Sequence, residues 1–223
     1  MATVKNSINN KAQDLTIDPG ASGDSFVQFN INGTGEFKIG VDDDASDAFK
    51  ISQGSALGTT DTFVMSAAGE RTMPLQPAFL AYNSSTLLNV TGDNTSYTVA
   101  FDSKIYDQNS DYNTGTYTFT APVTARYKVS IITNLGGCTA SHNSSQIDLV
   151  TSNRSYASLS SFSPAAVKTV WGTMSLNATL EVDMDAADTA YVVVNVQGGT
   201  KVIVITGGAS STIYSLFSAT LIC

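Results

Sequence analysis

The chain has 223 residues, of which 42% are hydrophobic and 13% charged, and its formal net charge at pH 7 is −8. This length suits one large all-β domain or two small ones. Nucleic-acid affinity rests mainly on Lys and Arg contacts to phosphates, so the acidic balance argues against a nucleic-acid partner, and an anionic membrane would repel the chain for the same reason. No run of about 18 apolar residues is present, so we expect no membrane insertion.

The first 23 residues are polar, with one short apolar alternation at Leu15 and Ile17. A polar terminus of this kind orders only against a partner. We therefore predict that residues 1–23 form an arm that attaches the protein to a larger particle. The first residues lack the apolar segment of a secretory signal peptide, and the initial Met favours a protein made and assembled inside a cell.

Residues 24–76 show strand-like alternation interrupted by turns. Asn32-Gly33 separates two apolar runs, which is a strong hairpin signal. An acidic loop follows at residues 42–47, and Pro74 and Pro77 mark the domain boundary because proline interrupts a β-ladder. Two or three hairpins rarely stand alone in water, so we expect this stalk domain to be stable when several chains wind together.

The most specific pattern lies between Phe101 and Ile131. It consists of aromatic residues and one acid at fixed long spacings, namely Phe101, Asp107, Tyr112, Phe119 and Tyr127. This order and spacing resemble the signature of the C1q-like head domain, a ten-stranded jelly roll also seen in tumour-necrosis-factor ligands. Three positions depart from the family pattern with small or apolar residues, namely Ala125, Val129 and Ile131.

The resemblance extends over residues 77–223. Residues 77–82 look like the family's first strand, the acidic loop from Asp185 to Asp188 looks like the one that leads into a buried strand, and residues 213–222 look like the closing strand. The fold class predicted is thus all-β: a C-terminal ten-stranded jelly-roll sandwich of the C1q/TNF-like type, preceded by a small β-rich stalk domain and an N-terminal arm. The predicted domains are residues 1–23, 24–76 and 77–223.

The strand at residues 191–196 is apolar on both faces, so it needs a second covering layer. In the family that it resembles, the layer is the neighbouring subunit of a trimer, and we expect a homotrimer. The alternative is a monomeric sandwich with apolar inner strands. In the jelly-roll arrangement Cys138 lies past the strand end opposite Cys223, so both thiols are expected to be free.

Residues with catalytic or metal-binding chemistry are few. His142 is the single histidine and lies in a Ser/Asn-rich loop, where it is either a partner for Cys138 or, as we favour, a solvated side chain. Aspartates in the loops at residues 42–47, 90–96 and 183–188 suit either Ca²⁺ or solvated turns, and we predict solvated turns without metal or cofactor. Trp171 is either core or a sugar-stacking surface, core being favoured. We predict that the protein is not an enzyme.

Counting strands from Pro77 predicts that four polar loops lie at the distal end of the head: residues 90–96, 136–145, 184–189 and 206–211. Polar loops on a rigid scaffold commonly carry binding, although the flank of the head is the alternative surface. The candidate binding residues are Asp93, Asn94, His142, Asn143, Asp185, Asp188 and Ser210.

The run from Phe37 to Ser52 resembles β-rich stalk segments of phage fibre proteins, and no Gly-X-Y stem is present. We therefore expect a trimeric fibre or spike of a virion, in particular of a bacteriophage. Its arm would dock to other virion proteins and its head would bind a glycan or protein receptor on the host surface. The alternative is an extracellular protein, a soluble or cell-surface C1q-like lectin or ligand module.

Overall fold

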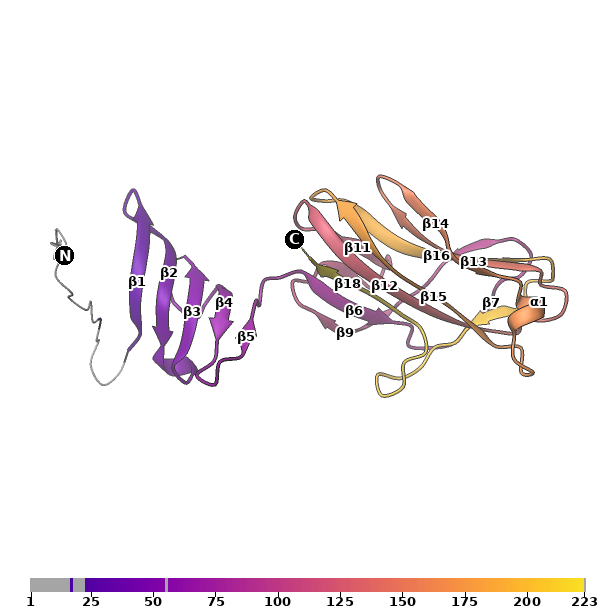
Figure 1. Ribbon diagram of the computed structural model, residues 1–223, viewed down its shortest axis with the longest axis horizontal. Helices are drawn as coiled ribbons and strands as arrows, with labels where there is room; N and C mark the ends of the chain where they lie inside the picture. Colours follow the sequence, from indigo (N-terminus) through magenta and orange to yellow (C-terminus); the bar gives the residue numbers. More distant parts are fainter. Residues whose placement is uncertain (1–16, 18–22, 55, 223) are drawn as a thin grey trace. The chain divides into compact units, whose positions relative to one another are not determined.

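A computed structural model describes residue 17, residues 23–54 and residues 56–222 of the chain. The predicted arm lies outside the described residues apart from Ile17 and Gly23. The chain divides into two compact units, Met1–Pro74 and Leu75–Cys223, two residues before the predicted stalk–head boundary. Both units are built from β-sheets (Figure 1). Among the described residues, no helix is long and apolar enough to cross a membrane.

The first unit is one five-stranded antiparallel sheet in which strands neighbour one another in chain order. Its strands are β1 (Ser25–Ile31), β2 (Thr34–Asp42), β3 (Ala48–Gln53), β4 (Asp61–Met65) and β5 (Arg71–Thr72). The predicted hairpin turn is confirmed: Asn32 and Gly33 join β1 to β2 with φ values of 52° and 82°. Both residues are left-handed, as a two-residue turn that matches strand twist requires. The acidic loop forms a 3-10 helix, Asp43–Ala45.

One face of this sheet buries charge. The Lys50 ammonium lies 2.8 Å from Oδ2 of Asp42 and 3.0 Å from Oδ2 of Asp61. The loop after β3 covers this cluster, since the Gly58 amide donates to Oγ of Ser52 over 3.2 Å. Burial by itself lowers the pKa of Lys50, but the hydrogen bonds and charges of the two aspartates outweigh it and raise that pKa above 10.5.

The second unit contains the remaining strands and one short helix. They are β6 (Ala78–Tyr82), β7 (Leu87–Thr91), β8 (Ser96–Thr98), β9 (Ser103–Asp107), β10 (Tyr112–Asn113), β11 (Thr118–Thr120), β12 (Ala125–Gly136), β13 (Ser144–Thr151), β14 (Ser155–Phe162), α1 (Pro164–Val167), β15 (Met174–Met184), β16 (Thr189–Gln197), β17 (Ile203–Ile205) and β18 (Leu216–Leu221).

These strands form two antiparallel sheets. The first has the order β9-β6-β18-β12-β15, and the second has the order β10-β11-β16-β13-β14. These ten strands make the jelly-roll sandwich expected from the sequence, so the predicted fold class is confirmed. Three short strands are additional: β7 and β17 pair with each other and extend the first sheet past β18, and β8 pairs with β16.

The core between the two sheets contains the aromatic residues of the signature. Phe101, Tyr112, Phe119 and Tyr127 are all at most 2% exposed. The Tyr112 hydroxyl donates to the Phe101 carbonyl over 3.0 Å, and burial raises the pKa of Tyr112. Asp107 accepts hydrogen bonds from the amides of Asp111 and Tyr112. The signature residues are therefore core and turn residues of the jelly roll.

The strand register defines two ends of the sandwich. We call the end at which β6 begins and β18 finishes the near end; there Thr220 pairs with both Ala78 and Lys128. At the far end, β12 finishes and β13 begins; in Figure 1 this end carries α1 and β7.

Candidate recognition surface at the far end of the sandwich

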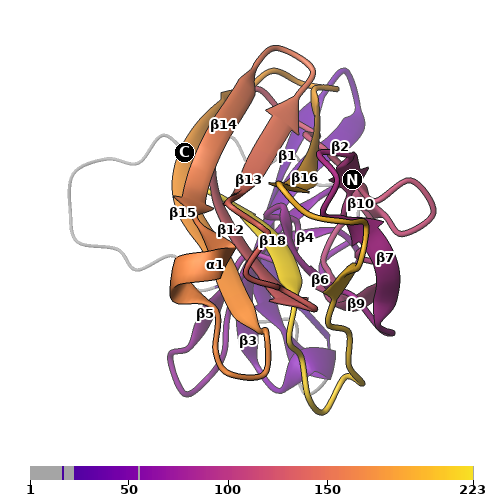
Figure 2. The ribbon, with the colours of Figure 1, turned by 90° about the vertical axis from the view of Figure 1, so that its right-hand side faces the viewer.

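Three loops meet at the far end, and His142 connects them. Ser144 pairs with Gln197, so the loop after β12 lies beside the loop after β16. Nδ1 of His142 accepts a hydrogen bond from the Thr139 amide over 2.9 Å, and Nε2 lies 3.2 Å from the Thr200 carbonyl oxygen. These contacts fit the tautomer that carries its proton on Nε2. Figure 2 shows this end of the sandwich facing the viewer.

The expectation that His142 is a solvated binding residue is wrong, because its side chain is fully buried. A glycine on each neighbouring loop makes room for the ring: a Cβ on Gly92 would lie 2.9 Å from Nε2, and one on Gly199 would collide with the ring. The His142 carbonyl also accepts a 2.9 Å hydrogen bond from the amide of Ala165 in α1. His142 thus holds the far-end loops together rather than meeting a ligand.

Asp93, Asn94 and Asn143 are exposed at this same end. The Asn94 amide donates to the Val196 carbonyl over 3.0 Å, which ties the loop after β7 to the end of β16. Hydrogen bonds from Thr95 lower the pKa of Asp93. The Asn143 amide donates to the Gln197 carbonyl over 3.1 Å. The structure therefore brings these three predicted residues to one surface.

The distal placement of Asp185 and Asp188 is wrong. Three strands, β13, β14 and β15, separate the loop after β12 from the loop after β15, and an odd number of reversals returns the chain to the opposite end. Met184 indeed pairs with Ala125 at the near end. Asp188 supports that turn, because it accepts hydrogen bonds from Ser152 and from the Asp185 amide, and these lower its pKa.

Ser210 also lies apart from the far-end loops. It is exposed on the connection from β17 to β18, and this connection is anchored on the segment after β6, since the Gly208 amide donates to the Asn83 carbonyl over 3.0 Å. Among the described residues, no group of three or more acidic, His or Cys side chains is placed to hold a metal ion. Cys138 is a buried free thiol whose pKa burial raises, while Cys223 lies outside the described residues.

The most exposed apolar side chains of the far end were not among the predicted site residues. Val170 is 92% exposed and Trp171 is 87% exposed. The interpretation of Trp171 as a core residue is therefore wrong. Aromatic side chains, tryptophan above all, are enriched among the residues that contribute most to binding at protein interfaces.

The turn that carries Val170 and Trp171 is rigidly built. The Gly172 amide donates to the Thr169 carbonyl over 2.9 Å, and the Thr169 and Thr173 hydroxyls are 2.7 Å apart. The Gly172 carbonyl accepts from the Cys138 amide, which fastens the turn to the loop after β12. The two side chains are thus presented to solvent on a preorganised backbone, which reduces the entropy cost of binding.

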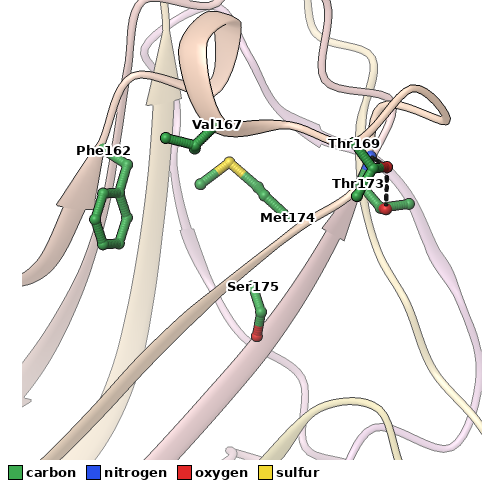
Figure 3. Close-up of a pocket in the computed structure, with 6 residues that line it drawn as sticks. All are labelled: Phe162, Val167, Thr169, Thr173, Met174 and Ser175. Atoms are coloured by element: carbon green, nitrogen blue, oxygen red, sulfur yellow. Dashed lines mark hydrogen bonds between the residues drawn. The ribbon is translucent and has the colours of Figure 1, made fainter.

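A pocket of about 340 Å³ lies beside this turn. Figure 3 shows Val167 and Met174 next to each other, with Phe162 on one side and the hydrogen-bonded Thr169–Thr173 pair on the other. Phe162 and Val167 are about half exposed, at 47% and 50%. Thr169 and Thr173, which flank Val170 and Trp171 in the turn, line this pocket, so the two exposed side chains lie next to it in the chain. Asp93, Asn94 and Asn143 are exposed at the same end of the sandwich.

The sequence holds one signal for this turn. Val170 and Trp171 stand between two threonines and directly before Gly172, outside any alternating apolar run. An isolated apolar pair followed by a glycine is typical of a turn tip, because the glycine accepts the positive φ of 74° observed here.

No protein-family model and no curated protein matches the sequence. Similar solved structures include the globular domain of zebrafish complement 1qA protein, at 16% identity and a TM-score of 0.45, over 66% of this chain and 98% of that one. They also include murine APRIL, at 7% identity and a TM-score of 0.44, over 66% of this chain and 99% of that one. At these identities the likeness concerns the fold alone, which the strand pairing defines independently.

Proposed function

We propose that the protein is a homotrimeric, non-catalytic recognition module whose head binds a surface ligand through the far end of the sandwich. The observation that supports this proposal most directly is the pair of exposed side chains, Val170 and Trp171. They lie on a hydrogen-bonded turn beside the pocket lined by Val167 and Met174. The ligand class that fits is a glycan or a protein with an exposed apolar face, because a tryptophan stacks on either.

Trimerisation would give this surface its strength. Three copies of a weak site on one particle convert modest affinities into tight attachment, because each later contact forms at a high effective concentration. The double-sided β16 supports the trimer: Ala190, Val192, Val194 and Val196 face the core, while Tyr191 and Val193 on the other face stay partly exposed.

The biological setting that we propose is a virion, with the protein as a bacteriophage fibre or spike. Residues 1–23 would attach it to other virion proteins, and the head would meet a glycan or protein receptor on the host surface. The support is the likeness of the sequence from Phe37 to Ser52 to phage stalk segments, together with a polar N-terminal arm.

A binding assay tests the far-end surface. The labelled full chain would be applied to purified bacterial surface polysaccharides and intact bacteria, and in a second arm to animal glycans. We expect Trp171→Ala to weaken the binding seen with the wild type at least about tenfold, as for a central aromatic anchor. Tyr106→Ala is the matched control, because Tyr106 is 45% exposed on β9, away from the far-end loops.

Two results would count against the proposal. Equal binding by the wild type and by a Val170→Ser, Trp171→Ala double variant would remove the far end as the binding surface. Binding to animal glycans with none to bacterial material would replace the phage fibre by the extracellular lectin alternative.

A further inference from the structure

The five-stranded sheet of the first unit has one almost wholly apolar face. Cross-strand partners share a face, and Val27 pairs with Ile39, Phe29 with Phe37, Val41 with Phe49, Ile51 with Phe63 and Phe49 with Met65. We call these residues the apolar face: Val27, Phe29, Phe37, Ile39, Val41, Phe49, Ile51, Phe63 and Met65. Phe37 also pairs with Gln53, and Met65 with Arg71, so these two polar residues lie at the rim of the apolar face. The charge of Arg71 is thus confined to the margin of the face.

This face is open to solvent in the single chain. Phe29 is 56% exposed, Phe37 43% and Val27 40%, and the side chains on β3 and β4 are partly exposed. Taking about 150–250 Å² for a fully exposed aromatic side chain and less for an aliphatic one, the exposed area is on the order of 400 Å². A contiguous apolar patch of this size usually marks an interaction site.

The opposite face of the sheet does not supply an apolar core in its place. It buries Lys38, Asp42, Lys50 and Ser52. Among the described residues of Met1–Pro74, the buried apolar side chains are Ala48 and Leu57 alone, and the main hydrophobic cluster lies within the second unit. The sheet therefore requires a partner on its apolar face to gain a core.

The size of the face indicates which partner covers it. A stable interface takes about 800 Å² from each partner, roughly twice what this face offers, so a separate protein would bind it weakly. Copies of this chain joined through their heads need no such area, because the tether supplies an effective concentration in the millimolar range. The uncharged centre also lets chains of net charge −8 approach without repulsion at the contact.

We propose that the apolar face packs against the same face of two other copies of the chain, which turns three sheets into one shaft with a shared apolar core. This inference rests on the homotrimer of the proposed function. In the shaft, the Lys50–Asp42–Asp61 cluster lies on the outward side of each sheet, because it belongs to the opposite face. Adjacent residues of β1 then lie on opposite sides of the sheet: Phe29 is buried in the shared core of the shaft, and Gln28 is exposed on its outer surface.

Cross-linking of the full chain tests this arrangement. Phe29→Cys and Gln28→Cys would each be made with Cys223→Ser, leaving Cys138 as the buried thiol, and treated with a short bifunctional maleimide. We expect covalent pairs of chains from Phe29→Cys and at least about tenfold fewer from Gln28→Cys, given the dependence of cross-linking on effective concentration. Sedimentation of the untreated wild type gives the oligomeric state in parallel.

Charge substitution provides a second measurement. Phe29→Asp should raise the concentration at which the trimer dissociates at least about tenfold, whereas Gln28→Asp, on the other face, should change it less than about twofold. A trimeric wild type whose Phe29→Cys variant yields no pairs overturns the shaft while leaving the homotrimer intact. A wild type that sediments as a single chain overturns both.

Discussion

Replacement of Lys50 by Met tests how the first sheet tolerates buried charge. The change keeps an unbranched side chain, one heavy atom shorter, and removes a cation that lies 2.8 Å and 3.0 Å from two carboxylates. The side chains of Lys50, Asp42 and Asp61 are 9%, 8% and 12% exposed. Removing one partner of such a cluster costs about 3–5 kcal/mol, because the remaining charge stays buried without compensation. The Ser52 hydroxyl and the Ala45 amide still donate to the aspartates, so we take about 3 kcal/mol.

Hydrogen exchange of the β3 backbone amides, followed by mass spectrometry, measures this loss locally. At about 1.4 kcal/mol per tenfold, 3 kcal/mol predicts exchange roughly 100-fold faster in β3 at neutral pH. In the wild type the raised pKa of Lys50 keeps its contribution intact below pH 10.5, and the contribution is lost as the pH rises past that raised value.

Lys38→Met is the matched control. Taken as whole residues, Lys38 and Lys50 are equally buried, each with an exposed fraction of 7%. The Lys38 ammonium, however, lies 3.6 Å from the centre of the Phe26 ring. Loss of a cation–π contact costs about 1 kcal/mol, so exchange should accelerate about fivefold. Equal acceleration in the two variants, or less than threefold acceleration in Lys50→Met, would refute the assignment of stability to the ion cluster.

Three further predictions concern the second unit. Val194→Asp should unfold the head or lower its Tm by more than about 10 °C, because Val194 is fully buried between the sheets; Val193→Asp, on the other face of β16, should be milder in thermal unfolding. Gly172→Ala should weaken far-end binding while the sandwich stays folded by circular dichroism, since Gly172 has a φ of 74° and a Cβ there would lie 2.7 Å from the Cys138 carbonyl oxygen. Asp111→Asn should raise the Tm at pH 7 and raise it less near pH 3. Burial in the first place, and the charge of Asp107 in the second, raise the pKa of Asp111, so ionisation of this carboxyl opposes folding once the pH exceeds the usual carboxyl value. An identical gain in Tm at both pH values would contradict this.

Much of the fold could be predicted because its determinants are local or periodic. In β12, Tyr127, Val129 and Ile131 are fully buried while Arg126 and Lys128 are exposed, as the alternation indicated. Asn32-Gly33 specifies its hairpin through backbone conformation alone. The aromatic signature predicts the sandwich because each of its rings fills the same core.

The site was less predictable because it depends on contacts between distant loops. His142 is buried through Thr200 and through glycines on two other loops, which no local pattern records. β14, with the sequence Ser-Tyr-Ala-Ser-Leu-Ser-Ser-Phe, alternates weakly, and the number of strands on each side decides at which end Asp185 lies. Residue type favours a core position for Trp171, whereas its exposure follows from its place at a turn tip.

The position of Trp171 has a practical consequence for spectroscopy of this protein. It is the only tryptophan in the chain and is 87% exposed in the folded state. Its emission should therefore be red-shifted already before denaturation and change little when the sandwich unfolds, so intrinsic fluorescence would be a poor probe of folding. The same property makes it a sensitive probe of occupancy, because any molecule that covers the turn would move the only indole of the chain out of water and shift its emission to the blue.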